Sequence, residues 1–288
     1  MQDPAGLARL LTRAGYFADE GVATAAYLAL ALPRPLFLEG EAGVGKTSLA
    51  HALAQVVGAE LLRLQCYEGI DASQALYDWD FPRQLLHLRA AEASGNADAD
   101  RLEQEVYSRR FLLARPLLAA LETTPSVLLV DEVDRADDEF EAFLLEVLSD
   151  YTVTVPELGT VHAEVPPIVV VTSNRTREVH DALKRRCLYH WIEHPGLERE
   201  VQIVRSRAPE VSTALTTQVV GVVQQLRERD DLEKPPGVAE TLDWARALHH
   251  LGTTELDLES SARTLGALVK YREDADRVRQ ALVQMLRP

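Results

Sequence analysis

The sequence predicts an α/β fold, in which helices cover both faces of a parallel sheet and a smaller, all-helical domain follows. Three observations predict it. Short apolar runs alternate with helix-like segments up to about residue 193, as the buried strands of parallel sheets do. A glycine-rich turn follows the first of these runs, and no strand-like run occurs beyond Arg199. We therefore predict a domain boundary near Pro195, with domains at 1–195 and 196–288.

Five runs are expected to form the strands. They are PLFLEG (35–40), ELLRLQCY (60–67), SVLLVDE (126–132), PIVVVTSN (167–174) and LYHWIE (188–193). The first, third and fourth are continuous apolar runs, which indicates strands buried on both faces. The second and fifth are weaker candidates because polar residues interrupt them.

Two additions to this alternating pattern are visible. The segment 68–125 is too long for one connection between strands, and two helix-like stretches, 73–93 and 98–122, flank the polar break SGNADAD (94–100). We expect an insertion there. The segment 151–165, YTVTVPELGTVHAEV, alternates apolar and polar residues on both sides of PELG, which is typical of a β-hairpin.

Composition restricts the functional classes. The hydrophobic fraction of 47% is enough for a substantial core, and the formal charge of -15 argues against a protein that coats nucleic acid. Cys66 and Cys187 form no CxxC pair, which fits a reducing compartment and predicts no zinc site. The longest apolar run is interrupted at residues 33–35 by PRP. We expect a soluble, cytoplasmic protein.

The turn GEAGVGKT (40–47) has the spacing GxxxxGK[ST] of a phosphate-binding loop (P-loop), between an apolar run and a helix-like stretch. Its glycines let backbone N–H groups surround phosphate oxygens. Lys46 is expected to reach the β- and γ-phosphates, and the Thr47 hydroxyl to bind Mg²⁺. The residues predicted to bind the nucleotide here are Gly40, Glu41, Ala42, Gly43, Val44, Gly45, Lys46, Thr47 and Ser48.

Polar side chains end two of the other apolar runs. Asp131 closes VLLVD, where its carboxylate is expected to hold Mg²⁺, and Glu132 follows as the base for an attacking water. Part of the acidic run DEVDRADDEFE also suits an exposed helix start, but that reading fits Asp138 better than Asp131 or Glu132. Asn174 ends VVVTSN, and its amide is expected to align the water. The pattern favours hydrolysis over phosphoryl transfer to a metabolite.

DALKRRCLYHW places Lys184, Arg185 and Arg186 at the end of a helix-like segment. Cations at that position interact favourably with a helix C-terminus. Alternatively, an arginine reaches the nucleotide of a neighbouring subunit and stabilises the charge of the transition state. The residues leave both interpretations open.

These elements, in this order and followed by helices, resemble the AAA+ ATPases. The insertion at 66–110 and the hairpin at 151–165 match in position those of the MoxR group, which carries an insertion in helix 2 and a hairpin before sensor 1. More narrowly, LQCYEGIDASQALYDWDF and SNRTREVHDALKRRCLYHWIEHP look like the CoxD-type ATPases. The resemblance extends from about Tyr16 to Leu286.

The resemblance implies a fold, a site and partners. The fold is a P-loop AAA+ αβα sandwich with a helical lid domain. By this resemblance, residues 40–47 correspond to Walker A, Asp131 and Glu132 correspond to Walker B, and Asn174 corresponds to sensor 1. The cofactors implied are ATP and Mg²⁺. Arg186 best matches the arginine finger, with Arg185 beside it. Where many lids place a sensor 2 arginine, this chain has Glu240 and Thr241, so another residue or none senses nucleotide there.

The implied assembly is a ring homo-oligomer, predicted to be a hexamer. CoxD-type ATPases accompany carbon-monoxide-dehydrogenase-like molybdenum hydroxylases and work with a von Willebrand A-domain partner. We therefore predict a ring remodeller that assists maturation of the metal centre of such a hydroxylase. The alternatives are an AAA+ motor acting on nucleic acid, a P-loop kinase and a small GTPase. A GTPase would carry NKxD, which is not found, and the overall charge counts against nucleic acid.

Overall fold

The computed structural model describes residues 3–94 and 98–286, and contacts between Cα atoms divide the chain into two compact units. The sheet unit comprises Thr24–Glu39 and Leu53–His190, and the P-loop unit comprises Met1–Ala23, Gly40–Ala52 and Trp191–Pro288. The domain boundary expected near Pro195 stays a prediction. None of the helices in the described part of the chain has the length and apolar character to span a membrane.

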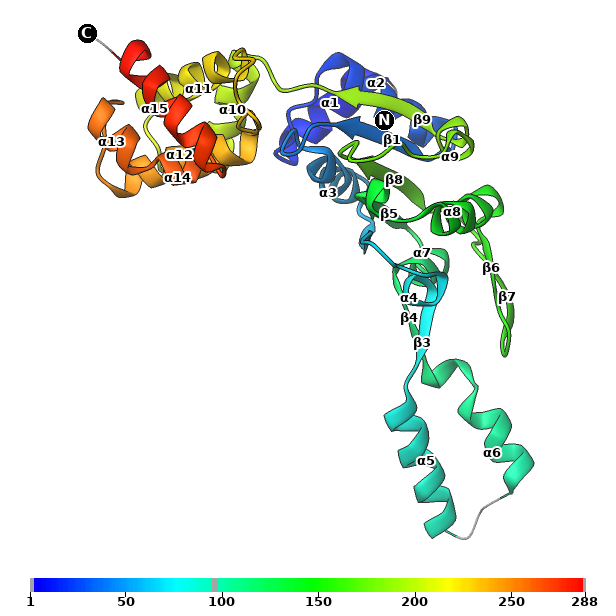
Figure 1. The fold of residues 1–288 in the computed structure, drawn as a ribbon. Coiled ribbons are helices and arrows are strands. Elements are labelled where there is room, and N and C mark those ends of the chain that lie inside the picture. Colours follow the sequence, from blue (N-terminus) through cyan, green and yellow to red (C-terminus); the bar gives the residue numbers. More distant parts are fainter. Residues whose placement is uncertain (1–2, 95–97, 287–288) are drawn as a thin grey trace. The chain divides into compact units, whose positions relative to one another are not determined.

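A five-stranded sheet has the order β2–β5–β8–β1–β9 (Figure 1). Its strands are β1 (Leu36–Gly40), β2 (Glu60–Gln65), β5 (Ser126–Asp131), β8 (Ile168–Ser173) and β9 (Leu188–Ile192). All five strands expected from the sequence are therefore confirmed. β2 pairs with β5, β5 with β8, and β8 with β1, in parallel throughout.

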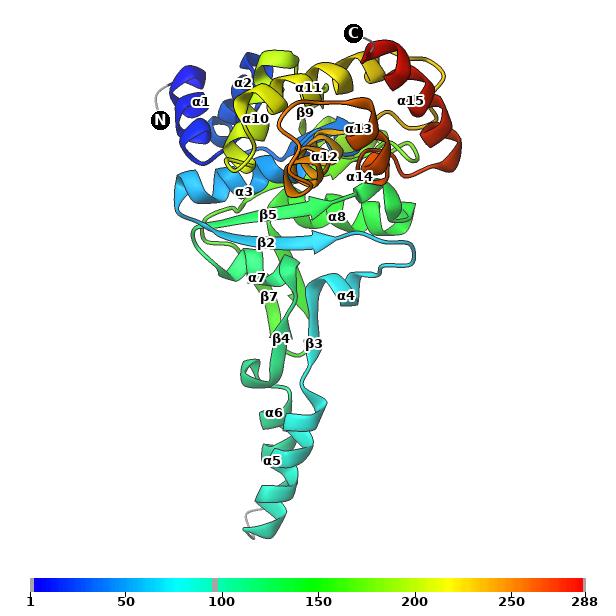
Figure 2. The ribbon, with the colours of Figure 1, turned by 90° about the vertical axis from the view of Figure 1, so that its left-hand side faces the viewer.

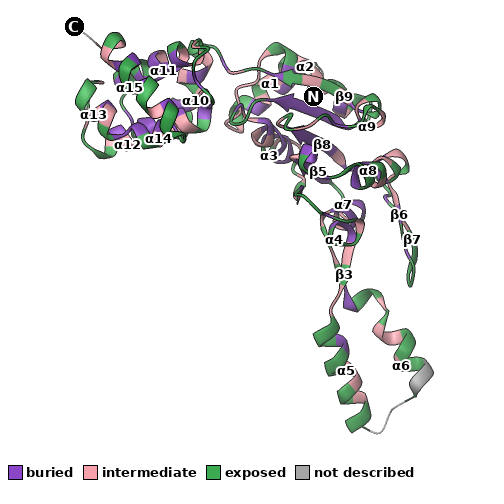
Figure 3. Cartoon of the chain, in the orientation of Figure 1, coloured by how far each residue is buried: buried purple, intermediate pink, exposed green. Residues whose placement is uncertain are grey.

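Burial explains why the central strands are apolar without interruption. Every residue of β5 is buried, and Figure 3 shows the central strands β1, β5 and β8 as mostly buried. Both faces of a parallel sheet are covered by helices, so alternation is lost. Helices that flank these strands in the sequence are α2 (Glu20–Ala31), α3 (Lys46–Val57), α7 (Pro116–Glu122), α8 (Asp138–Asp150) and α9 (Asp181–Arg186). Leu117, Leu128 and Leu144 belong to one continuous core of the sheet unit.

The insertion is present, but the two continuous helices expected at 73–93 and 98–122 are wrong, because shorter helices and two strands take their place. The chain forms α4 (Ala72–Leu76), β3 (Tyr77–Trp79), α5 (Phe81–Ala93), α6 (Ala99–Val106), a 3-10 turn (Arg109–Phe111) and β4 (Leu112–Ala114) before α7. β3 and β4 pair as a small antiparallel sheet, beyond which α5 and α6 extend (Figure 2). Residues 95–97 of the predicted polar break lie outside the described residues.

Local sequence explains why the two expected helices are broken. Asp80 caps α5, where Pro82 occupies the first turn, so the helix begins only at Phe81. Pro116 likewise begins a new helix, because its ring cannot continue the preceding one. The short segments that precede these two starts pair with each other as β3 and β4, and Tyr77 and Trp79 of β3 meet edge to face.

The hairpin expected at 151–165 is confirmed. β6 (Thr152–Val155) pairs antiparallel with β7 (Gly159–His162) directly after α8. Val153 and Val155 are buried in the same core as Leu117 and Leu118 of α7. The hairpin is therefore anchored to the helix that follows the insertion.

Beyond Pro195 the described chain contains helices and connecting loops only, as expected. These helices are α10 (Leu197–Arg207), α11 (Thr213–Arg227), α12 (Val238–His250), α13 (Leu258–Arg263), α14 (Leu265–Leu268) and α15 (Arg272–Met285). They enclose a second core around Trp244, whose Nε1 donates to Thr264 Oγ1 at 2.8 Å. The P-loop unit also contains α1 (Pro4–Arg13).

Candidate functional site: strand ends and P-loop

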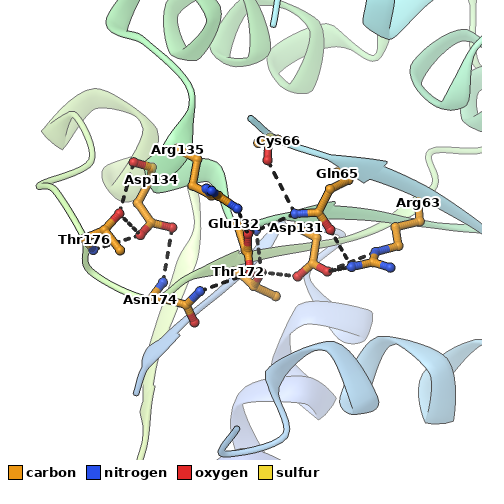
Figure 4. Close-up of polar contacts among 10 residues, drawn as sticks. All are labelled: Arg63, Gln65, Cys66, Asp131, Glu132, Asp134, Arg135, Thr172, Asn174 and Thr176. Atoms are coloured by element: carbon orange, nitrogen blue, oxygen red, sulfur yellow. Dashed lines mark hydrogen bonds and ion pairs between the residues drawn. The ribbon is translucent and has the colours of Figure 1, made fainter. Parts of the chain in front are cut away.

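Polar side chains gather where β2, β5 and β8 end (Figure 4). The parallel register sets Gln65 beside Asp131 and Val130 beside Val171. The carboxyl ends of the three strands consequently meet at one edge of the sheet, which is where α/β proteins build their sites. The sheet unit thus brings Asp131, Glu132 and Asn174 together.

Both carboxylate oxygens of Asp131 accept hydrogen bonds. Oδ1 accepts from Thr172 Oγ1 at 2.6 Å, and Oδ2 accepts from Arg63 Nε and Nη2 at 3.0 and 2.6 Å. Asp131 is almost fully buried. A buried carboxylate with cationic and hydroxyl partners is fixed in place. Its oxygen atoms are the kind of ligand that Mg²⁺ prefers.

Glu132 turns out of the strand in the left-handed region, with φ 55°, where a residue other than glycine is uncommon and often functional. Its amide donates to Thr172 Oγ1 at 2.9 Å. Oε1 accepts from Asn174 Nδ2 at 3.3 Å, and Oε2 accepts from Gln65 Nε2 and Arg135 Nη1, each at 3.1 Å. Because 32% of the side chain remains exposed, water still reaches this oriented carboxylate.

Asp134 fastens the loop that carries Asn174. Its Oδ1 accepts from the Asn174 amide at 3.1 Å, and its Oδ2 accepts from the amide and hydroxyl of Thr176 at 2.8 and 2.7 Å. Burial opposes ionisation of Asp134, but these hydrogen bonds outweigh it and hold the pKa of the carboxyl below its usual value. The Asp134 carboxylate therefore holds the backbone of Asn174 and Thr176 in place.

Four residues of the site were not predicted from the sequence: Arg63, Gln65, Thr172 and Asp134. One signal was available for the first two, because polar residues alternate with leucine at the end of the run ELLRLQ. Their side chains matter only once β2 pairs with β5. Thr172 looked like an ordinary member of an apolar run, and Asp134 like part of an exposed acidic helix start.

In the P-loop unit, the backbone of the P-loop accepts hydrogen bonds from its own lysine, Lys46. Lys46 Nζ donates to the carbonyls of Gly40 and Glu41 at 2.8 and 2.6 Å, and the side chain is buried. Thr47 follows in the first turn of α3. Gly43 has φ +81°, a left-handed conformation that favours glycine. The loop thus has the backbone form that presents successive amides to an anion.

The two candidate finger residues end α9 in the sheet unit. Arg186 donates to Ser149 Oγ, and Arg185 Nη2 lies 3.2 Å from Asp181 Oδ2. Arg34 donates to the carbonyl oxygens of both residues, at 3.2 and 2.9 Å, and so caps the helix. Both arginine side chains are exposed, which is the placement that a residue needs in order to reach another subunit.

Comparison with known proteins gives a family and a set of structural neighbours. The AAA domain family (dynein-related subfamily) matches residues 35–187, more than half of the chain. None of the proteins with curated functions matches the sequence.

The Thermotoga maritima RuvB Holliday junction branch migration motor is similar in structure, with 15% identity and a TM-score of 0.47 over 84% of this chain and 65% of that one. A single-residue variant of RuvB gives 14% identity and a TM-score of 0.49, over 86% and 67%. The present chain therefore spans about two thirds of the RuvB length.

The family match covers both the P-loop and the strands that carry Asp131, Glu132 and Asn174. The chain belongs to the AAA domain family, dynein-related subfamily, and is an ATPase.

Proposed function

We propose that the chain is the subunit of an ATP-driven ring of the MoxR group that remodels a protein client. One observation carries the proposal: the sheet unit holds an oriented, partly exposed glutamate and also two additions that ATP chemistry does not require. α8 follows the Glu132 turn directly and leads into the hairpin β6–β7, which packs against α7 at the base of the insertion. A movement at the strand ends therefore has a packed route to both additions.

The roles in hydrolysis follow from the chemistry of each group. We assign the phosphates to residues 40–48, and the oxygen ligands of Mg²⁺ to Thr47 and Asp131. Mg²⁺, when bound, neutralises charge on phosphate oxygens. Glu132 accepts a proton from water, and Asn174 keeps the carboxylate of Glu132 oriented through the 3.3 Å hydrogen bond.

We assign the arginine finger to Arg186, with Arg185 as the alternative, acting on the nucleotide of a neighbouring subunit. If so, turnover per subunit rises with protein concentration, and Arg186→Ala binds ATP without turning it over. Mixing Arg186→Ala with Lys46→Ala restores some activity at interfaces that combine one intact P-loop with one intact finger. Turnover that is independent of concentration, together with full activity of Arg186→Ala, would contradict this assignment.

The client is proposed from the sequence resemblance: a molybdenum hydroxylase whose metal centre is incomplete, with a von Willebrand A-domain protein as partner. Apolar side chains on α5 support an interaction role, because Phe81 and Leu86 are 62% and 71% exposed. The hairpin turn, Pro156–Leu158, is exposed as well.

The test shortens the hairpin turn by replacing Pro156–Leu158 with Asn-Gly, which suits a two-residue hairpin loop and keeps Val155 opposite Gly159. ATP turnover and hydroxylase maturation are then measured separately. Normal turnover with failed maturation supports the proposal, whereas normal maturation in a strain that depends on the shortened protein refutes the coupling role.

A further inference from the structure

Within the P-loop unit, the start of α12 lies directly against the phosphate-binding loop. The Val238 amide donates to the Gly43 carbonyl at 3.3 Å. We propose that this first turn is a positioning element, which holds the Gly43–Val44 peptide so that the Val44 amide faces the phosphates. The inference rests on the proposed phosphate-binding role of residues 40–48.

The geometry of the peptide bond links the direction of the Gly43 carbonyl to the direction of the Val44 amide. A trans peptide is planar, and its C=O and N–H point to opposite sides. When the Gly43 carbonyl is held by Val238, the Val44 amide of the same peptide must point away from α12. The peptide would otherwise be easy to turn, because glycine adopts both signs of φ with similar ease. An external hydrogen bond therefore selects one orientation of a phosphate-binding amide.

A buried ion pair keeps the start of α12 in place. Arg227 Nε donates to the Pro236 carbonyl at 2.6 Å, one residue before Gly237. Its Nη1 and Nη2 donate to the two carboxylate oxygens of Glu200 at 2.5 and 2.7 Å, and both side chains are buried. Thr241 donates to the same carboxylate at 2.7 Å. Removing one partner of such a pair leaves an uncompensated buried charge, so the turn has little freedom to drift.

The contact between Val238 and Gly43 is made by backbone atoms. It therefore needs no arginine side chain at the start of α12. Glu240, which stands near the usual place of that arginine, accepts a hydrogen bond from the Gly237 amide at 3.0 Å and so caps its own helix. Gly237 itself fits closely: a Cβ there would lie 2.8 Å from Glu240 Oε2, 3.0 Å from the Ala42 carbonyl oxygen and 3.2 Å from Gly43 Cα. Even one methyl group would push the P-loop backbone.

The chain offers a matched control for that methyl group. Gly196 precedes α10 as Gly237 precedes α12, with φ −65° and ψ 164° against φ −78° and ψ −179°. Alanine is compatible with both backbones. A Cβ at Gly196 would have no atom of the described residues within 4 Å, apart from its chain neighbours. The two substitutions therefore differ in the close contacts of the added methyl group, which meets the P-loop backbone and the Glu240 carboxylate only at position 237.

The experiment compares Gly237→Ala and Gly196→Ala in the full chain by titration with a fluorescent ATP analogue and Mg²⁺. We expect roughly tenfold weaker binding for Gly237→Ala, equivalent to the loss of one well-formed hydrogen bond, and unchanged binding for Gly196→Ala. The titration is run well below both melting temperatures, so that each protein is folded. The KM for ATP should rise more than kcat falls, because the change acts on binding.

A second variant removes the donor without adding a Cβ to Gly237. Val238→Pro deletes the amide that contacts Gly43, and proline is well tolerated at the first helical position. It should weaken binding in the same direction, while Leu197→Pro, at the first position of α10, should not.

Wild-type affinity in both Gly237→Ala and Val238→Pro overturns the inference. Lys46→Ala separates this outcome from failure of the proposed function. If Lys46→Ala binds ATP normally, the phosphate-binding role of the loop is wrong. If it loses binding while the other two do not, only the role of α12 is wrong.

Discussion

The carboxyl end of β5 and the helices α5 and α6 belong to the same unit, yet they use their side chains in opposite ways. At the strand end, Asp131, Glu132 and Thr172 are joined by hydrogen bonds of 2.6 and 2.9 Å, and each partner is fixed by the register of the sheet. On α5, Phe81 and Leu86 are exposed, and on α6 Arg101 and Glu105 form an ion pair at the surface.

The comparison separates two kinds of sensitivity. Removing a hydrogen-bonding atom at the end of β5 leaves its buried partner without a hydrogen bond. This lowers the free energy of unfolding by more than the hydrogen bond itself contributes. A surface side chain on α5 can be changed at little cost to the fold. Chemistry should therefore fail first at the strand ends, and partner recognition first at the insertion.

The largest effect is expected for Glu132→Gln. The amide keeps the shape and most hydrogen bonds of the side chain but does not accept a proton from water. ATP should still bind, while turnover falls at least ~100-fold. Steady-state phosphate release and nucleotide titration measure the two properties separately, and near-normal turnover would remove Glu132 from the catalytic role.

Thr172→Val should have the next largest effect. Valine preserves the volume but removes the hydroxyl that donates to Asp131 and accepts from the Glu132 amide. Unfolding in urea should become easier by about 1–3 kcal/mol, and turnover should fall more than ATP affinity.

Thr216→Val is the matched control, because the buried Thr216 hydroxyl has no hydrogen-bond partner among the described residues. Its removal should be neutral or stabilising. Equal losses in the two variants would show that burial, and not the link between Asp131 and Glu132, sets the cost.

A smaller, pH-dependent effect is expected at Asp134. Because its pKa is lower in the folded protein than in the unfolded chain, Asp134 stabilises the fold above its unfolded pKa of about 4. That contribution is lost as pH falls through the folded pKa.

Asp134→Asn should therefore be less stable than the parent at pH 7, and the difference should shrink as the pH falls below about 4. Urea unfolding at several pH values measures it. A difference that stays constant with pH would mean that the charge of Asp134 contributes nothing.

The smallest effect on ATP chemistry is expected for Leu86→Ser. The exposed side chain should change the free energy of unfolding by no more than about 0.5 kcal/mol and leave turnover unchanged. Any loss should appear only in client maturation. A marked fall in turnover of the isolated protein would erase the distinction between the two regions.

The sequence alone determined the parts of this protein that depend on local pattern. Apolar runs predicted all five strands, PELG predicted the hairpin, and glycine spacing predicted the P-loop. It also indicated that Asp131, Glu132 and Asn174 lie at the ends of two apolar runs, and the carboxyl ends of parallel strands share one edge of a sheet. Each of these signals is contained within a few consecutive residues.

Only the tertiary structure decided which side chains hold those residues. Gln65 contacts Glu132 across 67 positions of sequence because β2 pairs with β5 in one register, and a shift of one residue would turn its side chain to the other face. The β3–β4 pairing and the contact of Val238 with Gly43 likewise join distant segments. Such contacts depend on how elements pack, and packing is a property of the whole chain that no local pattern contains.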